Sequence, residues 1–274
     1  MKTEFRKETI TKHIYRIFGT GDVCMYFIKG SRKGLLIDTG YGIGDLKSYV
    51  EQEFAVPYEV IITHGHWDHA NGAGQWDEVY LNEADRELYR EFVSVSFRKD
   101  RLRKTVKDID SYPDDVFMPE FSGEFLDLDD GMTFDLGELT VEVISAPGHT
   151  MGIVTLLVIE DRTLIIGDAC GEFTFMFRKE TSTIEKYYET LNKLNDLSER
   201  YDLILRQHGS CTSPKNLITD NIDTVNDILN GTDDHVAWEY MGQKVFIAKR
   251  IDPATHQRYD GRSGNIVYST DKIR

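Results

Sequence analysis

The stretch THGHWDHANG, residues 63–72, places three histidines and an aspartate within six positions, directly after the apolar run 60–62. The whole chain has only eight histidines in 274 residues, so this concentration is unusual for its composition. Neutral imidazole and carboxylate groups are the ligands that first-row divalent metals prefer in proteins. The stretch therefore predicts a metal site with four candidate ligands, namely His64, His66, Asp68 and His69.

Three more metal-capable side chains follow apolar segments further along the chain. His149 follows VEVISAPG, Asp168 ends TLIIGD, and His208 ends LILRQH. The ends of strands are rigid and open to solvent, and catalytic groups often lie there. Five of the eight histidines therefore lie at the ends of predicted strands, whereas no metal role is expected for the other three, His13, His235 and His256.

The order of apolar and charged segments indicates one domain of mixed strands and helices, spanning residues 1–274. We found no internal repeat and no linker rich in proline or serine. Strands are expected at 13–19, 23–30, 34–40, 58–64, 132–137, 139–148, 152–160, 162–169 and 201–209, and helices at 41–54, 183–199 and 214–230. Residues 82–118 have a charged, helical pattern and are interpreted as an insertion over the site. Residues 232–274 are interpreted as a β-like C-terminal extension.

Composition and charge disfavour several classes of binding partner for this protein. The net charge of −15 and the pI near 5.0 disfavour nucleic acid and anionic membrane surfaces. Residues 1–10 lack the apolar core of a secretory signal, and no segment approaches the roughly 20 apolar residues of a membrane span. The three cysteines are widely spaced and form no C-x-x-C pair. We therefore expect a cytoplasmic protein with a small-molecule substrate, and the oligomeric state stays open.

The ordered series H-x-H-x-D-H, then a lone His, Asp and His after successive strands, resembles the metallo-β-lactamase fold superfamily of hydrolases. The upstream LLIDTG, with Asp38, matches the first motif of that family. The resemblance covers about residues 12–210. It implies an α/β protein with a four-layer αββα sandwich, in which two mixed sheets lie face to face, helices cover the outside, and metals bind at one sheet edge.

The resemblance also implies a role for each candidate ligand. His64, His66 and His149 would hold the first metal, and Asp68, His69 and His208 the second. Asp168 would bridge the two metals, and Asp38 would orient a ligand histidine through a hydrogen bond. Two Zn²⁺ ions per chain are the expected cofactors, with iron or manganese as alternatives for the same ligands.

A hydrolase of this family would use a metal-bridging hydroxide, aimed by Asp68 as the catalytic residue, to attack an ester, lactone or thioester carbonyl. A phosphodiesterase or phosphorylcholine esterase is the alternative, because such a centre also suits phosphorus. A non-catalytic metal-binding protein is a third hypothesis, although degenerate members usually lose ligands. All seven ligand positions are filled here.

Several branches of the family differ from this sequence at particular positions. Class B β-lactamases lack the bridging aspartate that Asp168 would supply. Flavo-diiron proteins place a glutamate at the position of His66, and acyl-homoserine lactonases place a tyrosine at the position of Gly171. Glyoxalase II enzymes add a helical C-terminal region, whereas the tail here is β-like. Nuclease members carry basic surfaces or extra domains.

Aromatic residues near the predicted ligands suggest a substrate pocket, lined by Trp67, Phe173, Phe175 and Phe177. Trp67 lies between two ligands, and GEFTFMF (171–177) has aromatic residues at every second position, which places them on one face of a strand. Packing of that face into the core is the alternative. The basic run FRKDRLRKTVK (97–107) is interpreted either as a solvated helix face or as an anion-attracting rim.

Overall fold

A mixed seven-stranded sheet forms the N-terminal half of the computed structural model, which describes residues 5–240 and 242–274. Its strands lie in sequence order, antiparallel as far as β4 and parallel from there on. They are β1 (Arg6–Thr9), β2 (Ile14–Phe18), β3 (Cys24–Lys29), β4 (Gly34–Ile37), β5 (Tyr58–Ile61), β6 (Glu78–Tyr80) and β7 (Glu124–Leu126).

A second mixed sheet has six strands in the order β14-β13-β11-β10-β9-β8. They are β8 (Thr133–Asp135), β9 (Thr140–Ser145), β10 (Val154–Val158), β11 (Thr163–Ile165), β13 (Leu203–Leu205) and β14 (Thr212–Ser213). All of its neighbouring pairs are antiparallel except β11 with β13.

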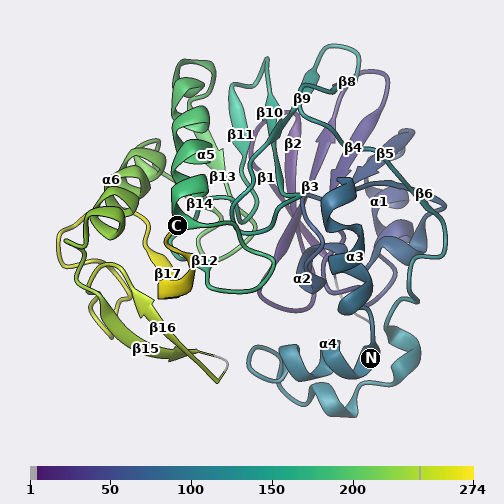
Figure 1. The fold of residues 1–274 in the computed structure, drawn as a ribbon. Coiled ribbons are helices and arrows are strands. Elements are labelled where there is room, and N and C mark those ends of the chain that lie inside the picture. The colour runs from purple at the N-terminus through teal and green to yellow at the C-terminus, as the bar shows by residue number, and fades with distance from the viewer. Residues whose placement is uncertain (1–4, 241) are drawn as a thin grey trace.

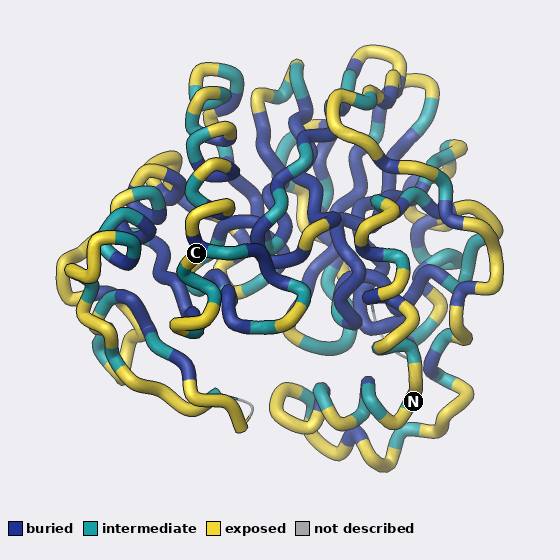
Figure 2. The backbone as a smooth tube through the Cα atoms, viewed as in Figure 1, coloured by how far each residue is buried: buried dark blue, intermediate teal, exposed yellow. Residues whose placement is uncertain are grey.

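The two sheets pack face to face, because successive side chains of their strands alternate between the inner and the outer face of each sheet. Leu35 and Ile37 of β4 lie in the same buried cluster as Leu156 of β10, whereas Leu36 belongs to a different cluster on the opposite face of its sheet. Leu157 likewise belongs to a cluster on the outer face of the second sheet. Because successive strand residues point to opposite faces, each of these strands is buried on both sides. Figure 2 shows this as a buried centre beneath exposed helix surfaces.

Helices cover the outer faces of both sheets (Figure 1). α1 (Leu46–Phe54) begins after its N-cap Asp45, which accepts the N–H of Ser48, and buries its apolar side against the first sheet. α5 (Ile184–Asp196) and α6 (Leu217–Asn230) pack against the second sheet. The remaining helices are α2 (Trp67–Ala70), α3 (Glu83–Glu91), α4 (Val95–Leu102) and the 3₁₀ turns at 73–75, 109–111, 114–116, 198–200 and 270–272. The predicted αββα arrangement is confirmed.

Two segments add further structure to the two sheets, and parts of both lie at one end of the molecule. Residues 82–118 contain α3, α4 and two 3₁₀ turns. The C-terminal residues contribute β15 (Val236–Tyr240), β16 (Gln243–Ile247) and β17 (Ile266–Tyr268), which join β12 (Thr174–Met176) in a third sheet. The β15–β16 hairpin and α4 lie at the same end of the molecule (Figure 1).

The segment 34–40, expected as one strand, is shorter in the structure. β4 ends at Ile37, because Asp38 adopts a left-handed backbone with φ of 64° that ends the regular strand. The helix expected over 41–54 begins only at Leu46, after a glycine-containing turn. No helix within residues 5–240 and 242–274 has both the length and the apolar character needed to cross a lipid bilayer.

Candidate metal centre

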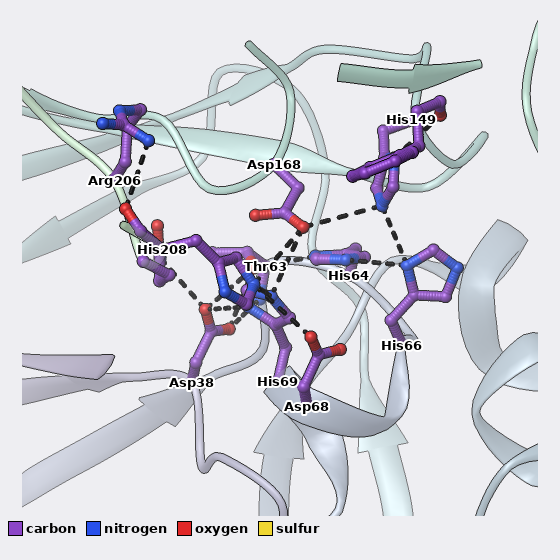
Figure 3. Close-up of polar contacts among 12 residues, drawn as sticks. Asp38, Thr63, His64, His66, Asp68, His69, His149, Asp168, Arg206 and His208 are labelled. Atoms are coloured by element: carbon purple, nitrogen blue, oxygen red, sulfur yellow. Dashed lines mark hydrogen bonds and ion pairs between the residues drawn. The ribbon is translucent and has the colours of Figure 1, made fainter. Parts of the chain in front are cut away.

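The residues of the HGHWDH stretch are placed by one strand and one short helix. β5 ends at Ile61, and His64 follows in the turn beyond it. His66 is the N-cap of α2, whose first turn carries Asp68 and His69. This turn brings all four side chains to the end of the sandwich where the loops bearing His149, Asp168 and His208 also converge (Figure 3).

Three imidazole nitrogens converge in a first group. Nδ1 of His66 lies 3.1 Å from Nε2 of His64 and 3.0 Å from Nε2 of His149. All three rings are buried. Three inward-pointing nitrogens at these separations form a set of donors suited to one divalent cation.

A second group lies beside the first and shares a carboxylate with it. Nε2 of His208 lies 3.2 Å from Nε2 of His69 and 3.4 Å from an oxygen of Asp68. One oxygen of Asp168 lies 3.7 Å from Nε2 of His69, 3.6 Å from Nε2 of His208, and 3.7 Å from Nε2 of His149. Asp168 therefore contacts imidazoles of both groups. The structure thus brings together all seven residues that the sequence analysis named as ligands.

The outward nitrogen of each ring has a protein partner. Asp38 holds His69, with its Oδ2 at 2.8 Å from Nδ1. The remaining contacts are His64 Nδ1 with Thr63 Oγ1 at 3.2 Å, His66 Nε2 with Glu180 Oε1 at 3.1 Å, His149 Nδ1 with the Phe175 carbonyl at 3.0 Å and His208 Nδ1 with the Asp22 carbonyl at 3.0 Å. Such partners fix ring orientation at metal sites, so the arrangement fits the metals that the family implies.

Asp38 connects three parts of the site from beneath. Its fully buried carboxylate accepts the backbone N–H and the hydroxyl of Thr63, at 2.7 and 2.9 Å, and the side-chain amide of Gln207 at 3.0 Å. The same carboxylate contacts His69. The predicted hydrogen bond between Asp38 and a candidate ligand histidine is therefore present in the geometry.

The surroundings of His64 and His149 in the first group favour their neutral form. Burial, and next the neighbouring imidazoles of His69 and His66, lower the pKa of His64 well below its usual range. Burial and the imidazole of His66 lower the pKa of His149 to about 4. Uncharged imidazole is the form that binds metal. Burial opposes protonation of His208 too, but the carboxylates of Asp168 and Asp68 raise its pKa to about 9.

Asp85, which the sequence analysis did not identify, fixes two ligand-bearing turns. Its buried carboxylate accepts the N–H of Gly65 at 2.9 Å, the hydroxyl of Thr150 at 2.6 Å and the N–H of Gly152 at 2.7 Å. A Cβ at Gly65 would lie 2.5 Å from the Asp85 carbonyl, and one at Gly152 would lie 2.7 Å from the carboxylate. Glycine is therefore needed at both positions, and α3 braces the turns of His64, His66 and His149.

A cavity of about 720 Å³ opens over the candidate ligands. Trp67, Phe173 and Phe175 line it, together with Tyr240 at the end of β15. Phe177 does not line it. Instead, Phe177 packs with Val245, Ile247 and Val267 in a small buried cluster. Of the four aromatics expected in the pocket, the structure therefore brings three to the cavity.

The basic run of 97–107 divides into residues with different surroundings. The buried Arg98 donates to the carbonyls of Tyr41, Gly42 and Met118, and thus supports the loop structure. Lys99 pairs with Asp114 at 2.7 Å, and Arg103 with Asp110 at 3.0 Å. Arg101, Arg103 and Lys104 line the cavity. Sequence pattern alone did not distinguish these environments.

Two further cavity or ligand contacts escaped the sequence analysis. Glu180 contacts His66, and Arg178 lies over the ring of Trp67 with its guanidinium carbon 4.8 Å from the ring centroid. Both follow β12 in an unremarkable charged stretch, and no local spacing links them to residues more than one hundred positions away. What marks Glu180 as a site residue is that its charged side chain is nearly buried beside the candidate ligand His66. This proximity is visible in the folded structure and not in the sequence.

Comparisons with known proteins agree with this site. The family model described as the metallo-beta-lactamase superfamily matches residues 19–208. Acyl-coenzyme A thioesterase MBLAC2 of Homo sapiens is 26% identical over 192 residues, covering 64% of this chain and 68% of that protein. Beta-lactamase-like protein 2 homolog of Caenorhabditis elegans is 27% identical over 179 residues, covering 63% and 52%.

A solved structure supports the fold. The metallo-beta-lactamase from Pontibacter korlensis superposes with a TM-score of 0.61 at 15% sequence identity, covering 82% of this chain and all of that one. The matched family segment contains every candidate ligand, from His64 to His208. The chain therefore belongs to the metallo-beta-lactamase superfamily and is a hydrolase.

Proposed function

We propose that the chain is a dinuclear metal-dependent hydrolase that cleaves a small-molecule thioester. The observation that carries the dinuclear assignment is the position of Asp168, whose one oxygen lies 3.6–3.7 Å from imidazoles of both ligand groups. His64, His66 and His149 would hold one ion, and Asp68, His69 and His208 the other. Two Zn²⁺ ions per chain are proposed, since imidazole and carboxylate suit zinc.

When bound, such ions supply a water of lowered pKa and polarise the substrate carbonyl. Asp68, whose carboxylate lines the cavity beside His208, would accept a hydrogen bond from the attacking water and receive its proton. In the overall reaction the water oxygen forms a bond to the carbonyl carbon, the C–S bond breaks, and the sulfur leaves as a thiol after taking up a proton.

The thioester is preferred over the other carbonyl substrates for two reasons. Relatives named acyl-coenzyme A thioesterases, from three vertebrates, match this chain at 24–26% identity. The cavity also combines an aromatic wall of Trp67, Phe173 and Phe175 with cationic side chains in its lining. Such a wall suits an apolar acyl group, as is usual for small-molecule sites.

A substrate panel tests the proposal. Protein reconstituted with zinc is assayed on an acyl thioester, the matching oxygen ester, a lactone and a chromogenic phosphodiester. We expect thioester cleavage, seen as thiol release, to exceed the other rates, to stop with a chelator and to return with zinc. Asp68→Asn is expected to lower kcat strongly, and its metal content is measured alongside because Asp68 would also hold the second ion. Cleavage of the phosphodiester alone would replace the proposal with the phosphodiesterase alternative.

A further inference from the structure

Cationic side chains line the cavity, although the chain as a whole has a net charge of −15. Arg101 lies near the C-terminal end of α4, Lys104 follows that helix, and Arg178 follows β12. All three line the cavity, with Tyr240 of β15 opposite Lys104. The cations come from segments far apart in sequence, so the fold and not a local run creates their proximity.

Arg178 is the member of this cationic group that lies nearest the candidate metal ligands. Its guanidinium lies over the ring of Trp67 at 4.8 Å and 3.8 Å from Oε1 of Glu180, the residue that contacts His66. The side chain is 17% exposed. Burial lowers the pKa of Arg178, although the nearby carboxylates of Glu180 and Asp68 oppose that shift. The guanidinium is therefore held in a desolvated position where an anion would interact strongly with it.

Arg101 and Lys104 extend the positive charge outward to solvent. The Arg101 side chain is 25% exposed, with its guanidinium carbon 5.2 Å from the ring centroid of Phe97. Lys104 is exposed, and its Nζ lies 5.7 Å from the ring centroid of Tyr240. The positive charge thus continues from the ligand group to the rim.

The carboxylates that also line the cavity have partners of their own. Asp22 accepts the hydroxyl of Tyr41 at 3.0 Å, and Glu172 pairs with Arg206 at 2.7 Å. Asp100 is shared between the neighbouring arginines at 101 and 103. Apart from the seven candidate ligands, the acidic groups on the wall are therefore engaged locally.

We propose that Arg178, Arg101 and Lys104 form an anion subsite that binds a phosphate or carboxylate group of the substrate away from its scissile bond. This inference rests on the proposed thioester hydrolysis. The planar guanidinium fork binds either anion through two parallel hydrogen bonds, and the lysine adds a mobile point charge at the rim. A substrate would then lie with its carbonyl at the metals and its anionic group toward α4 and β15.

Kinetics with matched thioesters test the subsite. The panel contains an acetyl thioester of coenzyme A, a succinyl thioester of N-acetylcysteamine and the neutral acetyl thioester of N-acetylcysteamine. Arg101→Gln combined with Lys104→Gln is expected to lower kcat/KM about tenfold for whichever anionic thioester the wild type prefers, and to leave the neutral one within twofold. The first two substrates distinguish a phosphate from a carboxylate. Lys107→Gln, an exposed neighbour outside the cavity lining, is the control.

A binding measurement separates this proposal from the hydrolytic one. Calorimetry of the metal-loaded protein with S-methyl coenzyme A, a thioether that cannot be hydrolysed, is expected to give a Kd that rises about tenfold in the double variant and in Arg178→Gln. Added salt is expected to weaken binding to the wild type more than to the variants. Binding without turnover would overturn the hydrolysis only. Equal losses for neutral and anionic thioesters, or a wild type without any anionic preference, would overturn the subsite.

Discussion

Oε1 of Glu180 lies 3.1 Å from Nε2 of His66, across 114 positions of sequence. The other nitrogen of the same ring, Nδ1, points into the first ligand group. Burial opposes ionisation of Glu180, but its hydrogen bond with His66 lowers the pKa of the carboxyl to about 2. The carboxylate therefore fixes which nitrogen of His66 faces the first ligand group.

We expect Glu180→Gln to weaken zinc binding in the first group about tenfold, because loss of such an orienting partner typically costs 10–100-fold in metal affinity. Competition with a chromogenic chelator measures this without any activity assay. Glu185→Gln, an exposed change at the start of α5, is the matched control. Affinities of the two variants within twofold of each other would show that Glu180 does not position His66.

The proposed stoichiometry is two metal ions per chain. Seven converging donors are enough for two ions with coordination positions left open for water and substrate. Elemental analysis of protein purified without chelators, and again after zinc reconstitution, is expected to approach two per chain. A value that stays well below one after reconstitution would remove the metal centre from consideration.

Asp168→Ala is expected to lose more metal than Asp38→Ala. Asp168 contacts imidazoles of both groups directly, whereas Asp38 acts through His69 and through its bonds to Thr63 and Gln207. Zinc affinity and content per folded chain decide between them, with folding checked by circular dichroism because Asp38 is fully buried. Equal metal losses from folded variants would mean that the bridging role is misassigned.

Asp85→Asn is expected to reduce both stability and metal binding. The amide would present N–H groups toward donors that now face a carboxylate, and an unsatisfied buried donor costs about 1–3 kcal/mol. We expect the Tm to fall by several degrees and zinc affinity in the group of His64, His66 and His149 to fall with it. Glu83→Gln, an exposed change on the same helix, should alter neither. Unchanged metal affinity in a destabilised Asp85→Asn would confine that residue to folding.

The sequence predicted that the seven candidate ligands converge, because their signals are local. Each of them follows an apolar segment, and strand ends meet at one edge of the sandwich. The contacts of Glu180 and Asp85 had no such signal, because they join α3 or the segment after β12 to distant turns. The pairing of β12 with β17, which positions Phe175, is likewise long-range, and Tyr240 contacts Phe175 from β15 of the same sheet.

The limits of a pattern are also visible in the aromatic stretch 171–177. Alternation predicted these aromatics on one face of a strand, whereas the structure forms a strand only over Thr174–Met176, and the pattern could not tell cavity from core. Phe175 lines the cavity and stacks on Tyr240 at 5.0 Å, whereas Phe177 lies in a cluster with residues of the C-terminal strands. That difference depends on where β16 and β17 lie, which no local spacing encodes.

Phe175→Ala is expected to reduce the preference for longer acyl groups while both metals stay bound. Burial of a methylene contributes about 0.8 kcal/mol, so kcat/KM should rise up to about fourfold per added CH₂ in the wild type, until the acyl group fills the aromatic wall. Removing the ring of Phe175 from that wall should reduce the increase in kcat/KM for each added CH₂, which is the acyl-length slope. A series of linear acyl thioesters differing by one carbon measures it.

Substitution of Trp67 tests the part of the aromatic wall nearest the candidate ligands. The ring of Trp67 also packs against Phe92 and Phe97, with ring centroids 5.1 and 5.3 Å apart. Trp67→Ala is therefore expected to lose stability as well as affinity, and Trp67→Phe keeps the packing while shortening the wall. Phe177→Leu, within the buried cluster, should lower stability without changing the acyl-length slope. Slopes that stay equal in the wild type, Phe175→Ala and Trp67→Phe would return these aromatics to a packing role.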